Sequence, residues 1–113
     1  MSKRTFVTLP YPTDEELYEK HGNYMAHVRS ERVKVPINYK EVYLAIRFYP
    51  RAGFDVDVAQ TLQLVIQSLE GYTIQTAQQI RALYMYVEPE SNVPRIEVMQ
   101  KNFQPDNKKE SGK

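Results

Sequence analysis

The stretch EVYLAIRFYPRAGFDVDVAQTLQLVIQSLEG, residues 41–71, decides the fold because its apolar periodicity changes once, from two residues to between three and four. Residues 41–49 alternate between two faces, which predicts a strand. From Val58 the spacing predicts an amphipathic helix over about residues 56–69, closed by Gly71 as its C-terminal cap. The predicted core comprises one face of the strand and one stripe of the helix, namely Val42, Leu44, Ile46, Phe48, Val58, Leu62, Val65, Ile66 and Leu69.

Further strands are predicted on both sides of this stretch. Residues 5–9 are β-branched and apolar, and they end before Pro10-Tyr11-Pro12, where prolines cannot continue a sheet ladder. Residues 79–87 alternate again, and a last strand is expected around Ile96 and Val98, forming a hairpin with the strand before it. Strand, helix and strand in this order make a βαβ unit with parallel strands. The sequence therefore predicts an α/β fold with a small mixed sheet and one crossover helix.

Three other segments have no clear period. Residues 13–16 can cap one helical turn, but residues 21–23, His-Gly-Asn, are expected to interrupt any longer helix. Residues 25–35 are interpreted as an irregular hairpin. Residues 101–113 are polar and charged, so we expect one domain over residues 1–100 followed by a disordered tail.

Length and composition exclude several classes of protein. A chain of 113 residues can bury one core. Its 15 basic and 14 acidic residues give a net charge of +1, so any contact with DNA must come from a local patch. The absence of cysteine excludes thiolate metal ligands and suits a reducing compartment, so a cytoplasmic location is expected. No stretch approaches the roughly 20 apolar residues of a membrane span, and we expect neither a membrane partner nor a small-molecule cofactor.

Asp55 and Asp57 are the candidate catalytic and metal-binding residues, because they stand one residue apart at the junction of strand and helix. Their oxygens can converge on a hard cation such as Mg²⁺. The alternative is structural: Asp55 caps the helix and Asp57 interacts with the helix dipole. Spacing alone favours the structural alternative. Two carboxylates also fall short of what two-metal nucleases assemble, so a third ligand would have to come from elsewhere.

Several segments follow the order and spacing of one known protein family. They are residues 7–12, the strand at 41–49, the Asp55-Val56-Asp57 junction, residues 71–78 and Arg95-Ile96-Glu97-Val98. In these segments the chain resembles the RusA family of Holliday junction resolvases, which are Mg²⁺-dependent endonucleases of phages and bacteria that act as homodimers. The resemblance implies a RusA-like fold, branched DNA as the partner, a homodimer, and Mg²⁺ bound in part by Asp55 and Asp57.

The chain departs from the family pattern at positions that carry the chemistry. Gln75 and Thr76 replace an Asp-Asp pair that includes the family's third catalytic carboxylate, and Thr61 stands where the family usually has a catalytic lysine. Loss of a metal ligand and of a transition-state cation implies weak Mg²⁺ binding and slow or absent cleavage. We therefore expect a divergent RusA-like protein of phage or prophage origin that binds branched DNA as a homodimer, with weak or no nuclease activity.

Two other functions stay open. One is an active Mg²⁺-dependent Holliday junction endonuclease, and the other is a protein-binding regulator or inhibitor on the same fold. An unrelated α/β interaction module, with the nine tyrosines as its protein-binding surface, is a further alternative. For DNA contact the candidates are basic residues near the strand and the junction, namely Arg4, Lys34, Lys40, Arg47 and Arg51. Arg51 directly precedes the acidic junction, where it can contact phosphates, although an ordinary solvated arginine fits equally well.

Overall fold

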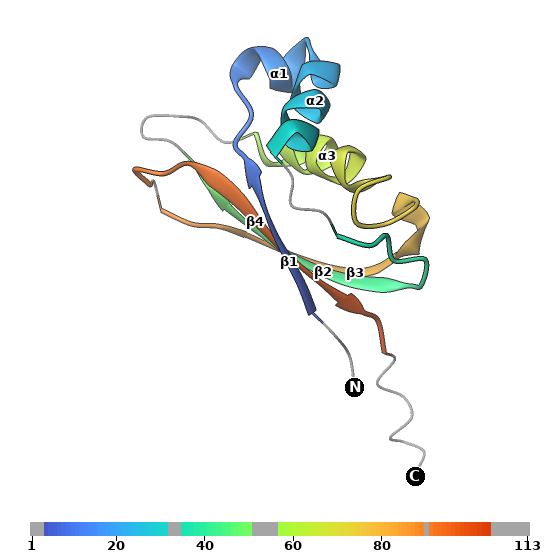
Figure 1. Ribbon diagram of the computed structural model, residues 1–113. Coiled ribbons are helices and arrows are strands. Elements are labelled where there is room, and N and C mark those ends of the chain that lie inside the picture. Colours follow the sequence, from blue (N-terminus) through green and yellow to red (C-terminus); the bar gives the residue numbers. More distant parts are fainter. Residues whose placement is uncertain (1–3, 32–34, 51–56, 90, 105–113) are drawn as a thin grey trace.

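The computed structural model describes residues 4–31, 35–50, 57–89 and 91–104 of the chain (Figure 1). The elements are β1 (Arg4–Pro10), α1 (Asp14–Tyr18), α2 (His21–Glu31), β2 (Val42–Tyr49), α3 (Val58–Leu69), the short 3₁₀ turn η1 (Ala77–Gln79), β3 (Ile80–Val87) and β4 (Arg95–Asn102). The described strands form one sheet in the order β1-β4-β2-β3. β4 is antiparallel to both of its neighbours, whereas β2 and β3 are parallel and are connected through α3. The predicted mixed sheet with one βαβ crossover helix is confirmed.

The described helices all lie on one face of the sheet (Figure 1). Beneath them the four alternating apolar residues of β2 are completely buried, as the sequence predicts: Val42, Leu44, Ile46 and Phe48. They form one cluster with Leu17 of α1, Tyr24 of α2 and Leu64 of α3. None of the helices in the described ranges is both long and apolar enough to cross a membrane.

The buried stripe of α3 differs from the predicted one by a rotation of the helix. The stripe contains Thr61, Leu64, Val65, Ser68 and Leu69, whereas the predicted Val58, Leu62 and Ile66 are only half-buried. The spacing of apolar residues in the sequence does not reveal this rotation, because two of the five inward-facing residues, Thr61 and Ser68, carry hydroxyl groups. The Ser68 hydroxyl donates to the Val65 carbonyl at 2.8 Å, so its polar atom is satisfied inside the helix. Gly71 has φ of 80°, which confirms the predicted left-handed cap.

The helical layer before β2 is more regular than the sequence indicates. α1 begins with a capping box, in which the backbone N–H of Glu16 donates to the Thr13 hydroxyl and the backbone N–H of Thr13 donates to the Glu16 carboxylate. The first helix is short, as predicted, but the break comes after Tyr18, and residues 21–23, which the sequence predicts to interrupt the helix, begin α2 instead. The irregular hairpin expected over residues 25–35 is also wrong. Tyr24 and Val28, one helical turn apart, are both buried, so packing on the sheet stabilises a helix whose own pattern is weak.

The predicted hairpin between the last two strands is wrong, because β2 lies between them. The connection from β3 to β4 crosses the end of β2, where the Glu88 N–H donates to the Phe48 carbonyl and the Ser91 N–H to the Pro50 carbonyl. β4 takes the inner place because one of its faces carries Ile96 and Val98, both fully buried. It also extends to Asn102, past the expected end of the domain at residue 100, and residues 105–113 lie outside the described part.

Tyr24 connects α2 to the end of β1. Its side chain is completely buried, and its hydroxyl donates to the Pro10 carbonyl at 2.7 Å. Burial raises the pKa of this phenol far above its ordinary value of 10.0, because the phenolate would lose its hydration; the charges of Glu16 and Tyr11 act in the same direction.

Tyr24 should therefore make the protein sensitive to alkali. Above pH 10.0 the unfolded chain releases this proton while the folded chain retains it, so the free energy of unfolding should fall by up to about 1.4 kcal/mol per pH unit. Below that pH the contribution is complete. Urea unfolding between about pH 8 and about pH 11 should show this decline in the parent protein and a shallower one in Tyr24→Phe. Tyr39→Phe, at a side chain that is 67% exposed, should keep the decline. Equal slopes for the parent and Tyr24→Phe would contradict the assignment.

Candidate functional site

Asp57 is the N-cap of α3 and also holds α1 in place. Its Oδ1 accepts from the Gln60 backbone N–H at 3.1 Å, and its Oδ2 accepts from the Tyr18 hydroxyl at 3.0 Å. The hydrogen bond to the carboxylate raises the pKa of Tyr18, because it stabilises the neutral phenol. The sequence assigns the cap to Asp55, and this assignment is wrong: Asp57 is the capping residue. Asp55 itself lies outside the described residues.

The described residues hold only part of the predicted magnesium site, because Asp55 lies outside them. Mg²⁺ needs near-octahedral oxygen ligands, usually including one or two carboxylates that are free to coordinate it. Both oxygens of Asp57 accept one hydrogen bond each from protein donors, and each oxygen keeps a second lone pair. Within the described ranges, no three His, Cys, Asp or Glu residues gather where they could bind a metal ion. We therefore assign no catalytic step to a metal at Asp57.

The positions that the resemblance assigns to one active site lie apart in this fold. Thr76 stands just before η1, next to Ala77, whose N–H donates to the Glu70 carboxylate at 2.7 Å. Asp57 is at the opposite end of α3, and the 12 residues of the helix span about 18 Å. Gln75 lies beside Thr76, and the backbone N–H groups of both donate to the Gln79 side chain.

Thr61, at the family's lysine position, is also unsuited to chemistry. Its side chain is completely buried against the sheet, and its hydroxyl has no hydrogen-bond partner among the described residues. A lysine at this position would place an ammonium group inside the core, at a cost of several kcal/mol unless the group lost its proton. The structure therefore gives no route to a RusA-type site through Thr61 and Thr76.

The second candidate region is the face of the sheet that no described helix covers, which we call the open face. Alternation and strand register place on it Arg4, Phe6 and Thr8 of β1, Arg95, Glu97, Met99 and Lys101 of β4, Tyr43, Ala45, Arg47 and Tyr49 of β2, and Ala82, Tyr84 and Tyr86 of β3. Aromatic and basic side chains alternate across it. Three of the rings are substantially exposed, with exposed fractions of 69% for Phe6, 52% for Tyr84 and 42% for Tyr86.

The cations of the open face are held against its rings. The Arg95 guanidinium lies 3.9 Å from the centroid of the Tyr49 ring, and its Nε donates to Glu97 at 2.8 Å. The Lys101 ammonium lies 4.9 Å from the Tyr43 centroid. Such contacts orient a cation on the face, and Arg95 is held further by the Val93 carbonyl, to which its Nη1 donates at 3.0 Å.

Arg47 and Arg4 are the predicted DNA contacts that the structure places on the open face. The Arg47 guanidinium lies 4.5 Å from the Tyr86 ring centroid and forms an ion pair with Glu88, and the hydrogen bond to that carboxylate raises the pKa of Arg47. Arg4, at the end of β1, shares this face and has no side-chain partner in the described structure.

Among the remaining predicted DNA contacts, Lys40 alone belongs to the described residues. Lys40 lies before β2, and its backbone contacts Asn38 and Gln79. Arg51 and Lys34 lie outside the described residues. The sequence analysis did not select Phe6, Arg95 or Lys101 as DNA contacts. Once β1 and β4 are assigned as strands, these residues can be placed on the open face, because they alternate with buried residues along each strand.

Comparison with known proteins adds no family to this geometry. No protein-family model matches the chain, and no curated protein matches it either. The resemblance to the RusA family therefore rests on short segments of sequence, and the function has to be argued from the described side chains.

The cap at Asp57 can be tested by substitution. Asp57→Ala removes the acceptor for both Gln60 and Tyr18, and it should lower the free energy of unfolding by about 1 kcal/mol. Asp57→Asn should lower it by only a few tenths, since asparagine caps helices about as well as aspartate. Urea unfolding followed by circular dichroism measures both values. Equal losses in the two variants would show that the negative charge, and not the cap, stabilises this junction.

Proposed function

We propose that this protein binds DNA through the open face and has weak or no nuclease activity. The observation that carries the proposal is the combination of basic and aromatic side chains on one uncovered sheet face. Basic groups attract phosphates and release counterions from DNA, and aromatic rings stack on bases. The four basic residues of this face are Arg4, Arg47, Arg95 and Lys101.

Local charge supports binding to a polyanion. The open face has four basic side chains, opposed by Glu97 on the face and by Glu88 at its rim, which pairs with Arg47. This leaves an excess of two positive charges in one region of a chain whose total charge is only +1. The open face thus combines a local positive excess with exposed rings, and both features are typical of a nucleic-acid interface.

The bonding of Asp57 supports binding without cleavage. Its carboxylate serves as a helix cap and as the acceptor for Tyr18. The positions that would complete a RusA-type site are either buried, as Thr61 is, or at the far end of α3, as Thr76 is. Branched DNA, in the form of a four-way junction, is the substrate that the family resemblance suggests.

We also propose that the protein acts as a homodimer that pairs through β3. β3 is an edge strand whose only described neighbour is β2. Its last four residues, Tyr84 to Val87, are all large and exposed, and Arg81 is its only charged residue. Long apolar edges without proline or central charge pair readily with another strand. Antiparallel pairing of two β3 strands would join the two open faces into one continuous surface.

Binding should depend on Arg4 and Arg47. The double variant Arg4→Gln with Arg47→Gln should weaken binding to a fluorescent four-way junction by about tenfold or more. The slope of the logarithm of affinity against the logarithm of salt concentration should also become shallower by up to about two, because each phosphate contact contributes close to one to that slope. Fluorescence anisotropy at several salt concentrations measures both.

The matched control is Lys20→Gln, between α1 and α2, where Lys20 pairs with Glu15. It should leave affinity unchanged. Incubation of the parent protein with the junction and Mg²⁺ should give slow cleavage or none. Absence of binding would overturn the proposal, and so would rapid cleavage that Asp57→Asn abolishes.

The dimer predicts a mass of about twice 13.3 kDa in sedimentation at micromolar concentrations. Met85→Lys places a charge on the β3 edge strand and should shift the protein toward the monomer, because charged side chains on an edge strand oppose pairing with a second strand. Val93→Lys, in the loop before β4 at a side chain that is 64% exposed, should leave the dimer intact. A parent protein that sediments as a monomer would contradict this assignment.

A further inference from the structure

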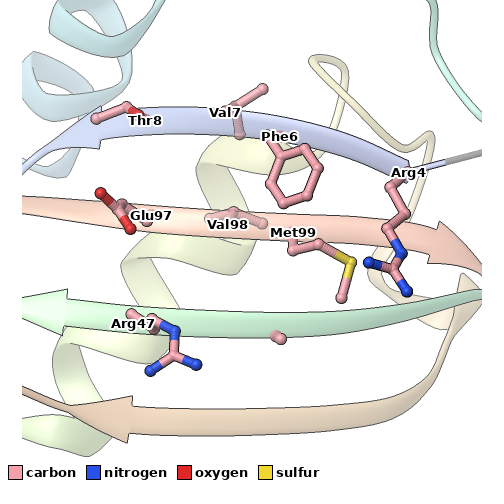
Figure 2. Close-up of a pocket in the computed structure, with 9 residues that line it drawn as sticks. Arg4, Phe6, Val7, Thr8, Arg47, Glu97, Val98 and Met99 are labelled. Carbon is pink, nitrogen blue, oxygen red and sulfur yellow. The ribbon is translucent and has the colours of Figure 1, made fainter.

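The open face has a hollow at its centre, with a volume of about 460 Å³. Its floor consists of Met99 and Ala45 on the two inner strands, and Phe6 of β1 stands beside it. Figure 2 shows Phe6 and Met99 between Arg4 at one end and Arg47 and Glu97 at the other.

The hollow is a consequence of strand register. Phe6 pairs with Met99, Met99 with Ala45, and Ala45 with Tyr84, so these four residues form one row across all four strands. Alanine leaves a gap in the middle of this row, whereas the two ends carry rings that are 69% and 52% exposed. Three strand spacings separate the two rings, which is about 14 Å. An apolar floor thus lies beside the exposed Phe6 ring, and Tyr84, at the other end of the row, packs edge-on against Tyr43.

Polar groups at the two ends of the hollow match the parts of a nucleotide. Arg4 is paired with Lys101 across β1 and β4, which places two cations beside one end of the row. At the other end, Glu97 and Arg47 are paired across β4 and β2. A carboxylate accepts from the amino group of a base, and a guanidinium donates to ring nitrogens, carbonyl oxygens or phosphate. The site therefore combines an apolar surface for a ring with polar groups at its edges.

We infer that this hollow binds one unpaired base, so that the protein prefers single-stranded DNA, or the unpaired bases of a branch, over continuous duplex. The inference rests on the DNA binding proposed for the open face and specifies the form of its substrate. In a duplex both faces of each base are stacked, so no base can reach the floor formed by Ala45 and Met99. An unpaired base can lie flat there and stack against Phe6 or Tyr84, while its phosphates contact Arg4 or Lys101.

The test compares three fluorescent ligands of equal length: a single strand, its duplex, and a single strand with abasic sites in place of the bases. The parent protein should bind the single strand about tenfold more tightly than either of the others. Ala45→Ile fills the hollow without changing charge, and a branched residue suits a central strand. It should weaken binding of the single strand about tenfold and leave the duplex and the abasic strand unchanged.

The matched control is Ala26→Ile, which enlarges an exposed alanine of α2, on the helical layer that covers the other side of the sheet. It should leave all three affinities unchanged. Circular dichroism should show that both variants fold, and Phe6→Ala provides a second probe because Phe6 is exposed.

The outcomes separate this inference from the function on which it rests. Equal binding of single strand and duplex, or binding of the single strand that neither Ala45→Ile nor Phe6→Ala weakens, would overturn the base site and leave DNA binding in place. Failure to bind any of the three ligands, or the four-way junction, would overturn both. Equal affinity for the normal and abasic strands would show that phosphates alone are recognised, and would also overturn the base site.

Discussion

Burial of one face of β2 is the constraint on which the rest of the structure depends. Val42, Leu44, Ile46 and Phe48 have no exposed surface, and the helices pack on this side alone among the described elements. Side chains alternate along a strand, so burial of these residues directs their neighbours to the opposite face. The registers with β4 and β3 extend this division over the whole sheet. The arrangement of rings and cations on the open face therefore follows from the packing of the core.

The elements that the sequence predicts well are those with a strong local period. β2 has four alternating apolar residues, and α3 has an apolar stripe with a glycine cap, so both are recognisable within a short window. α2 and the place of β4 depend on contacts between distant residues. α2 is stabilised by the burial of Tyr24 and Val28 against the rest of the core. β4 pairs with β1, which lies at the other end of the sequence, and with β2. No local pattern encodes such contacts.

In the candidate sites too, some residues can be identified from local sequence, whereas their roles depend on contacts between distant residues. Asp57 could be selected from the sequence because it stands at the start of a predicted helix, and Arg47 because it is basic and lies on a strand. The role of Asp57 depends on Tyr18, 39 positions away, which a motif at the junction does not include. The hollow depends on the register of Phe6, Met99 and Ala45, which come from three strands. Only the assembled sheet brings these three side chains together.

One-sided coverage of the sheet has an evolutionary consequence. Residues such as Ala45 and Phe6 contribute little to the packing under the helices, so they can be exchanged while the core and the strand order persist. A lineage can then acquire or lose a binding preference through a few substitutions, whereas the same number of changes at positions such as Leu44 or Ile46 would unfold the domain. Natural variation in this fold should accumulate in alternate residues along each strand, with the recognition surface diverging faster than the scaffold beneath it.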